Sequence, residues 1–152
     1  YDALPDIGHA CGHNLIAISG VGAAIGLKAV LEKFNIKGTV KLFGIPAEEK
    51  GSGKTDLIKA GAYEGVDISL MVHPSLATVP SRFTDQGNVT YLVSGFHPLY
   101  DICTPVPTNA KQKTAYEETI KATSGMTLVG LDFLIDDEFA KQVNESFTKS
   151  KL

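Results

Sequence analysis

The feature that most constrains this chain is its longest apolar stretch, which runs from Leu15 to Val30. It is interrupted by small residues and one cation: Ser19, Gly20, Gly22, Gly26 and Lys28. A bilayer span needs about 20 apolar residues, and this stretch is shorter. It therefore predicts a buried, closely packed helix that continues to about Phe34. Asn14 is the predicted N-cap, and Lys37 and Gly38 the predicted end.

Composition supports one globular domain. The 152 residues are 43% hydrophobic and 20% charged, which is enough apolar material for a core. The net charge of -3, without any basic run, argues against a nucleic-acid or membrane-surface partner. Two cysteines, Cys11 and Cys103, are too few for a disulfide framework, although one bridge between them is possible. We therefore expect a reducing, cytoplasmic compartment.

Helical and strand patterns alternate after this first helix. Thr39 to Ile45 is rich in β-forming residues and stops at Pro46, Thr55 to Ala62 has a short helical pattern, and Val66 to Val72 predicts a second strand. Such an order is typical of an α/β fold with a mixed or parallel central sheet flanked by helices. In such folds functional groups gather where strands end.

The last part of the chain predicts a strand, a loop and two helices. Asn88 to Val93 has a strand pattern, and Pro98 to Lys113 is a proline-containing loop. Tyr116 to Phe147 has the periodicity of two amphipathic helices, with a break near Asp136 and Asp137. We expect a single domain, residues 1–152, without internal repeats.

Chemistry-bearing residues occur at three places along this pattern. Cys11 and His13 are two residues apart, so both can face one metal centre from an extended loop, and Gly12 permits close backbone approach. Glu48 and Glu49 follow Pro46, and as neighbours they point in different directions. One of them can bind a metal while the other takes a proton from water.

His73 follows the second predicted strand and supplies a further nitrogen ligand. A divalent metal lowers the pKa of bound water from about 15.7 to about 7, which is what hydrolysis of an amide near neutral pH requires. Each feature alone is more often structural than functional: a Cys-Gly-His can be a loop, and a glutamate pair is usually just solvated. Their combination at strand ends favours a metal site.

Three motifs resemble the M20 metallopeptidase family. They are the stretch from Tyr1 to Asn14 (YDALPDIGHACGHN), Pro46-Ala47-Glu48-Glu49, and Met71-Val72-His73-Pro74. The match is closest to the branch of M20 domain-containing dipeptidases and aminobenzoyl-glutamate hydrolases, and the segment from Thr84 to Tyr91 is also similar to it. The resemblance implies that Cys11, His13, Glu49 and His73 bind two divalent metal ions and that Glu48 is the general base.

The same resemblance implies cleavage of amide or peptide bonds in small substrates, such as dipeptides and N-acyl or aminoacyl conjugates. Zinc is the expected metal, and manganese and cobalt remain possible. The chain departs from the family in three ways. The usual inserted dimerisation domain is missing near residues 75–83, the strands that precede the first motif are absent, and no histidine follows His97 to supply a last ligand. A monomer is therefore expected rather than the family dimer.

Other interpretations remain open. A truncated, non-catalytic remnant could keep the fold and perhaps one metal. Lys50 to Thr55 mimics the end of a phosphate-binding loop, but Glu48 stands where the pattern requires glycine, and its carboxylate would repel phosphate. A thiol-redox role for Cys11 lacks the second cysteine of a Cys-x-x-Cys motif. We expect His97 to be structural or substrate-facing, and His9 to orient the site from its loop.

Overall fold

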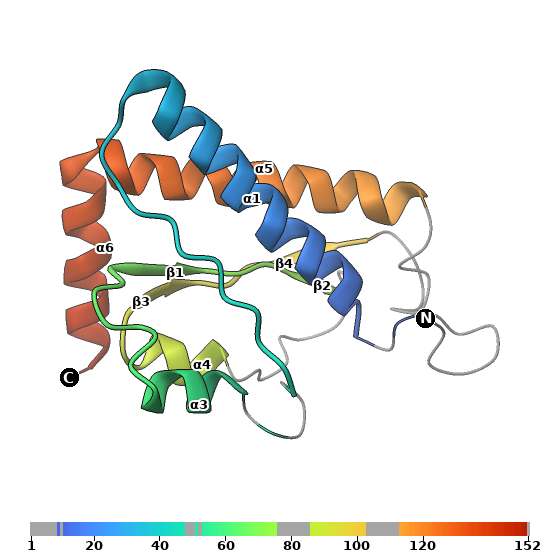
Figure 1. Cartoon of the computed structure of the whole chain (residues 1–152), viewed down its shortest axis with the longest axis horizontal. Helices are drawn as coiled ribbons and strands as arrows, with labels where there is room; N and C mark the ends of the chain where they lie inside the picture. Colours follow the sequence, from blue (N-terminus) through green and yellow to red (C-terminus); the bar gives the residue numbers. More distant parts are fainter. Residues whose placement is uncertain are drawn as a thin grey trace.

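The computed structural model describes residues 9, 11–47, 51, 53–75, 86–102 and 113–151. Within these ranges, helices and short strands alternate as expected of an α/β fold (Figure 1). In chain order they are α1 (His13–Phe34), α3 (Gly53–Lys59), β1 (Ile68–Leu70), β2 (His73–Ser75), α4 (Gln86–Thr90), β3 (Ser94–Phe96), β4 (Leu99–Asp101), α5 (Lys113–Ile135) and α6 (Asp137–Ser150).

The four strands form two parallel pairs, β1 with β3 and β2 with β4. The register is the same in both pairs: Ile68 lies opposite Ser94, and His73 lies opposite Leu99, so partner residues are separated by the same number of positions along the chain. The two pairs are therefore successive halves of one parallel ribbon. This confirms the predicted fold class.

Proline explains why the ribbon is interrupted. The amide of Met71 donates to the carbonyl of Phe96 at 3.0 Å, and the amide of His73 donates to the carbonyl of Pro98 at 3.1 Å. A regular parallel ladder would add a bond from residue 98 back to the carbonyl of Met71. Pro98 has no N–H and cannot make it. His73 and His97 both lie next to this break.

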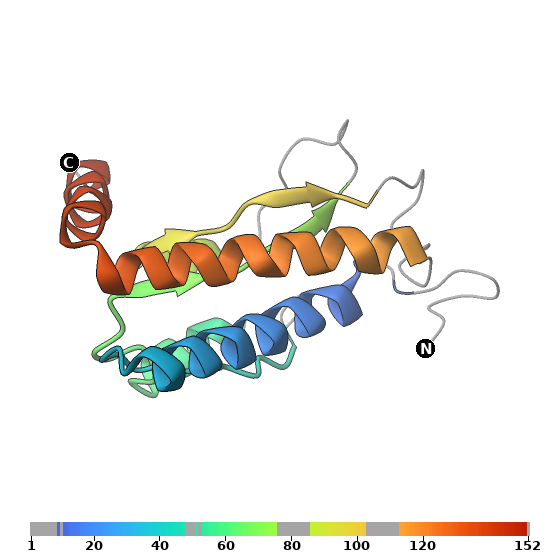
Figure 2. The same cartoon turned by 90° about the horizontal axis from the view of Figure 1, so that it is seen from above.

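Helices cover the ribbon on both sides (Figure 1). On one side, Val72 packs with Ala23 of α1 and Met126 of α5 in a buried cluster. Figure 2 shows α1 and α5 running side by side along this layer. Their close approach depends on small residues in α1, since a Cβ added to Gly22 would lie 2.9 Å from the Thr123 methyl group. On the other side lie α3 and α4.

Helix α1 is flanked at both ends by residues with a left-handed backbone conformation. Gly12 is its N-cap, with φ of 76°, and no side chain caps it, so the prediction that Asn14 is the cap is wrong. Asn14 lies within the first turn instead. The helix ends at Phe34, as predicted, where Asn35 adopts a φ of 51° and its amide bonds to the carbonyl of Leu31.

By length and composition α1 could cross a membrane, because it has 22 residues and an 18-residue window within it has a mean hydropathy of 1.7, so the expected shortfall in length does not hold. A core helix of a soluble protein passes the same test. Its buried residues recur every four positions and form one stripe: Leu15, Ser19, Ala23, Leu27 and Leu31. The predicted burial therefore holds for that stripe, whereas Ile18, Val21 and Ile25 are exposed.

The strand predicted over Thr39 to Ile45 is wrong, because the structure has no regular element there. A strand forms only where a neighbouring edge satisfies its backbone groups, and in the described part of the chain no strand pairs with this segment. Side chains hold it instead. Lys41 Nζ donates to the carbonyl of Glu64 at 2.9 Å, and the rings of Phe43 and Tyr63 lie 4.7 Å apart.

The strand predicted over Asn88 to Val93 is also wrong. Helix α4 occupies its first half, up to Thr90, and β3 begins only after a turn. Two buried side chains at helical spacing, Gln86 and Val89, decide the outcome, because packing overrides β propensity. The region predicted as a loop after Pro98 likewise contains β4.

The remaining element predictions are confirmed with shifted ends. The helix predicted from Thr55 is α3, and the strand predicted from Val66 is β1. Helices α5 and α6 are separated at Asp136, whose side chain accepts a hydrogen bond from the amide of Phe139 at 2.9 Å. This is an ordinary N-cap.

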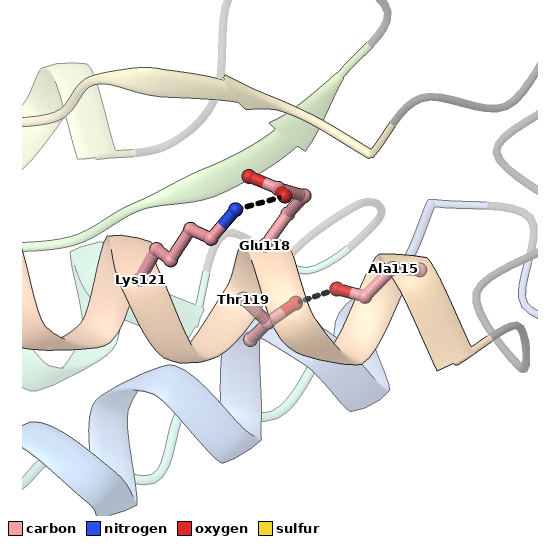
Figure 3. Close-up of polar contacts among 4 residues, drawn as sticks. All are labelled: Ala115, Glu118, Thr119 and Lys121. Atoms are coloured by element: carbon pink, nitrogen blue, oxygen red, sulfur yellow. Dashed lines mark hydrogen bonds and ion pairs between the residues drawn. The ribbon is translucent and has the colours of Figure 1, made fainter.

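Helix α5 carries buried hydroxyl groups that bond within the helix. Figure 3 shows the hydroxyl of Thr119 donating to the carbonyl of Ala115 at 2.7 Å, and the exposed pair of Lys121 and Glu118 at 2.6 Å. Because Thr119 donates its only proton to Ala115, the hydroxyl of Tyr100 must donate to Thr119, at 2.9 Å. The hydroxyl groups of Thr119 and Tyr100 are thereby satisfied.

Candidate metal centre

The Cys-Gly-His motif lies at the start of α1. Gly12 is buried and has φ of 76°, and a Cβ on it would lie 2.7 Å from Cγ of Pro74. Only glycine fits such a position without strain. Its carbonyl accepts the amides of Leu15 and Ile16 and starts the helix. The contact of Gly12 with Pro74 thus holds the half-buried Cys11 near Pro74, the residue that follows His73. His13 is exposed at the first position of α1.

The thiol of Cys11 meets His73 across the fold. Sγ lies 3.3 Å from Nε2 of His73, although the two residues are 62 positions apart. The other ring nitrogen, Nδ1, lies 2.7 Å from the carbonyl oxygen of Pro74. A carbonyl only accepts, so Nδ1 carries the proton and, in the neutral ring, Nε2 accepts from the thiol. This is the tautomer that presents Nε2 to a metal.

His73 does not follow a strand end, as the sequence suggested. It is the first residue of β2, just after the break in the ribbon. The two glutamates predicted for the site, Glu48 and Glu49, lie outside the described residues, as does Cys103. The structure therefore brings together Cys11 and His73 from the predicted set, and the glutamate roles stay predictions. The expected missing domain near residues 75–83 also falls mostly outside the described ranges.

His97 is a neighbour of this pair that the sequence did not assign to the metal. Its ring lies edge-on to that of His73, with 6.2 Å between the centroids. The Nε2 atom of His97 is buried and has no hydrogen-bond partner in the part of the chain that the structure describes. Burial lowers the pKa of His97 to about 4, and the nearby charges of His73 and Lys54 act in the same direction.

The strand register explains why the two imidazoles meet. Opposed residues of parallel strands point to the same face, and side chains alternate along each strand. His73 lies opposite Leu99, and His97 precedes Leu99 by two positions, so both histidines fall on one face. Val72 and Tyr100 belong to the other face, where they pack against α1 and α5. In the sequence, both histidines stand in a His-Pro pair, but the register that brings them together is visible only in the fold.

The donor set suits a divalent metal of borderline softness, since it combines a thiol with imidazole nitrogens. Within the described ranges, no group of three His, Cys, Asp or Glu side chains stands close enough to hold a metal ion without adjustment. Two observations nevertheless fit such an ion. They are the contact of Sγ with the correctly oriented Nε2 of His73, and the unsatisfied Nε2 of His97 beside it.

Nearly the whole chain matches one known family. The model of peptidase family M20/M25/M40 matches residues 1–150. The chain belongs to this family. The resemblance found in the three sequence motifs is thereby confirmed, together with a fold that agrees with part of the family's catalytic domain.

Curated relatives of this M20 chain are hydrolases. A Xaa-Arg dipeptidase from Mus musculus is 60% identical over 77 residues, which are 49% of this chain and 18% of that protein. A component of the p-aminobenzoyl-glutamate hydrolase of Escherichia coli is 46% identical over 67 residues, 44% of this chain and 14% of its own length. An N-acetyl-L-cysteine deacetylase of Bacillus subtilis is 39% identical over 65 residues, 43% and 15% respectively. The chain therefore spans only a small part of these relatives.

Proposed function

We propose that this M20 chain carries the site of a metal-dependent hydrolase that cleaves amide or peptide bonds in small substrates. The observation that carries the proposal is the contact of Cys11 Sγ with Nε2 of His73 at 3.3 Å, formed by two of the family's sequence motifs. Dipeptides and N-acyl or aminoacyl conjugates are the proposed substrates. They follow from the relatives, which are named as a dipeptidase, an aminobenzoyl-glutamate hydrolase and a deacetylase.

The proposed roles divide between binding and proton transfer. Cys11, His13, Glu49 and His73 would hold two divalent ions, with zinc as the proposed metal. When bound, such ions polarise a carbonyl group and acidify water. Glu48 would accept the proton of the attacking water and return it to the leaving amine. The hydrogen bond from Nδ1 of His73 to Pro74 keeps the imidazole in the tautomer needed for this.

Compartment and partners follow from the same chemistry. A thiol ligand must stay reduced, so we propose the cytoplasm as the working compartment. The proposed partner is a small peptide or amide substrate rather than a nucleic acid or a membrane.

The test is hydrolysis by the purified chain. A dipeptide ending in arginine, aminobenzoyl-glutamate and an N-acetyl amino acid would each be incubated with zinc, manganese or cobalt, and with a chelator. We expect turnover of at least one substrate that a chelator abolishes and that Glu48→Gln lowers by about 10²–10⁴-fold. The matched control is Glu32→Gln, because the side chain of Glu32 is 68% exposed on α1. No turnover under any condition would favour the non-catalytic remnant.

A further inference from the structure

His97 carries a ring nitrogen whose hydrogen-bonding capacity is not satisfied by the described residues. Its Nε2 atom is buried and has no partner among the described residues. Leaving a buried nitrogen unsatisfied is costly, so native proteins rarely keep one without a reason. The chain has four histidines, and this one lies within ring contact of another that belongs to the proposed metal site.

Two spacings among the three side chains, that of Cys11 with His73 and that of His73 with His97, are close to those of ligands on one metal. With zinc–sulfur and zinc–nitrogen bonds of about 2.3 Å and about 2.0–2.1 Å, tetrahedral geometry puts the sulfur roughly 3.5 Å from each nitrogen. Cys11 Sγ and His73 Nε2 are 3.3 Å apart. Two imidazoles on one tetrahedral ion have centroids about 5–5.5 Å apart by the same bond lengths. The centroids of His73 and His97 are 6.2 Å apart.

We infer that Nε2 of His97 is a metal ligand, which completes a site of one thiolate and two imidazoles with Cys11 and His73. This inference rests on the proposed metal-dependent function and adds a ligand to it. The ring of His97 must approach by about 1 Å, which explains why the three side chains do not form a metal-binding group as they stand.

The burial of His97 agrees with this role. A metal binds the lone pair of a neutral imidazole nitrogen, and Nε2 of His97 is a buried nitrogen that no described residue satisfies. With Cys11 and His73, His97 would give one of the two proposed ions three protein ligands, and a zinc ion with three protein ligands takes water or substrate as the fourth. Three protein ligands with one open position are the arrangement of catalytic zinc sites rather than structural ones.

The experiment measures cobalt binding by absorption spectroscopy, because a thiolate bound to Co²⁺ gives a charge-transfer band. The full chain would be titrated with CoCl₂ as the wild type, His97→Ala and His97→Cys. We expect His97→Ala to weaken binding by at least tenfold and His97→Cys to restore it. In His97→Cys the band should about double, because a second thiolate binds the ion; a merely structural role would not change the band.

The matched control is Ser94→Cys. Ser94 is 3% exposed on the strand that leads to His97, and its hydroxyl faces Asn144 of α6 rather than the site. It adds a buried thiol without adding a ligand, so its band should equal that of the wild type. An unchanged affinity in His97→Ala, with no added band in His97→Cys, would overturn the role of His97 and leave the proposed function standing. A wild type without any thiolate band would overturn both.

Discussion

Replacing Gly12 with alanine should destabilise the chain through two separate effects. The residue has φ of 76°, and a side chain in the left-handed region costs about 1–2 kcal/mol. The new Cβ would also lie 2.7 Å from Cγ of Pro74, a rigid ring that cannot swing away. Overpacking of this kind costs about 1–3 kcal/mol. We therefore expect a loss of about 2–5 kcal/mol in the free energy of unfolding.

Urea denaturation followed by circular dichroism measures this loss. Gly65→Ala is the matched control, because Gly65 has φ of 67° but nothing lies within 4 Å of an added Cβ. It should show only the left-handed cost of about 1–2 kcal/mol. The same Gly12→Ala variant should weaken cobalt binding, since Cys11 and His73 are brought together at this contact. Equal destabilisation in the two variants would refute the claim that Gly12 is required by Pro74.

Three further predictions concern stability. Asp136→Ala should lose about 1 kcal/mol in urea melts, because it removes the cap on the amide of Phe139, and Asp136→Asn should lose much less. Leu15→Ala, at a fully buried position, should lower the free energy of unfolding by about 2–5 kcal/mol in the same assay. A smaller loss would mean that the residues around Leu15 move in to fill the cavity. In the metal-free protein, the lowered pKa of His97 stabilises the fold above pH 6.5. This contribution should disappear as the pH falls to about 4, so His97→Gln should show a flatter pH dependence between these values.

The parts of the fold that the sequence predicts well are those where local signals agree with packing. Helix α1 ends at the predicted Phe34 because apolar residues recur at helical spacing up to Leu31. Helices α5 and α6 separate at Asp136 because an aspartate is a good N-cap wherever the chain can bend. These features depend on neighbours within a few residues, which a single sequence displays.

The parts that fail depend on distant partners. Thr39 to Ile45 has strand-forming residues, yet whether it forms a strand depends on a neighbouring edge that its own sequence does not show. Val89 is completely buried in α4, and that tertiary contact overrides the strand pattern around it. The break in the ribbon at Pro98 was visible as a proline, but its effect requires knowing that Met71 lies opposite.

The same division applies to the site. Spacing alone could suggest that Cys11 and His13 share a function, and resemblance connected them with Glu48, Glu49 and His73. The contact between Cys11 and His73, 62 positions apart, required the fold. His97 could not be linked to the site from sequence, because its proximity to His73 arises from the register of two parallel strands.

The most direct test of the central claim is the metal content of the purified chain, measured by elemental analysis after removal of loosely bound ions. The proposed function predicts two divalent ions per chain in the wild type, as in other two-metal hydrolases, and fewer in Cys11→Ser and Glu49→Ala. Wild-type protein that contains no metal, and takes none up from zinc-supplemented buffer, would contradict the claim that these motifs form a working hydrolase site.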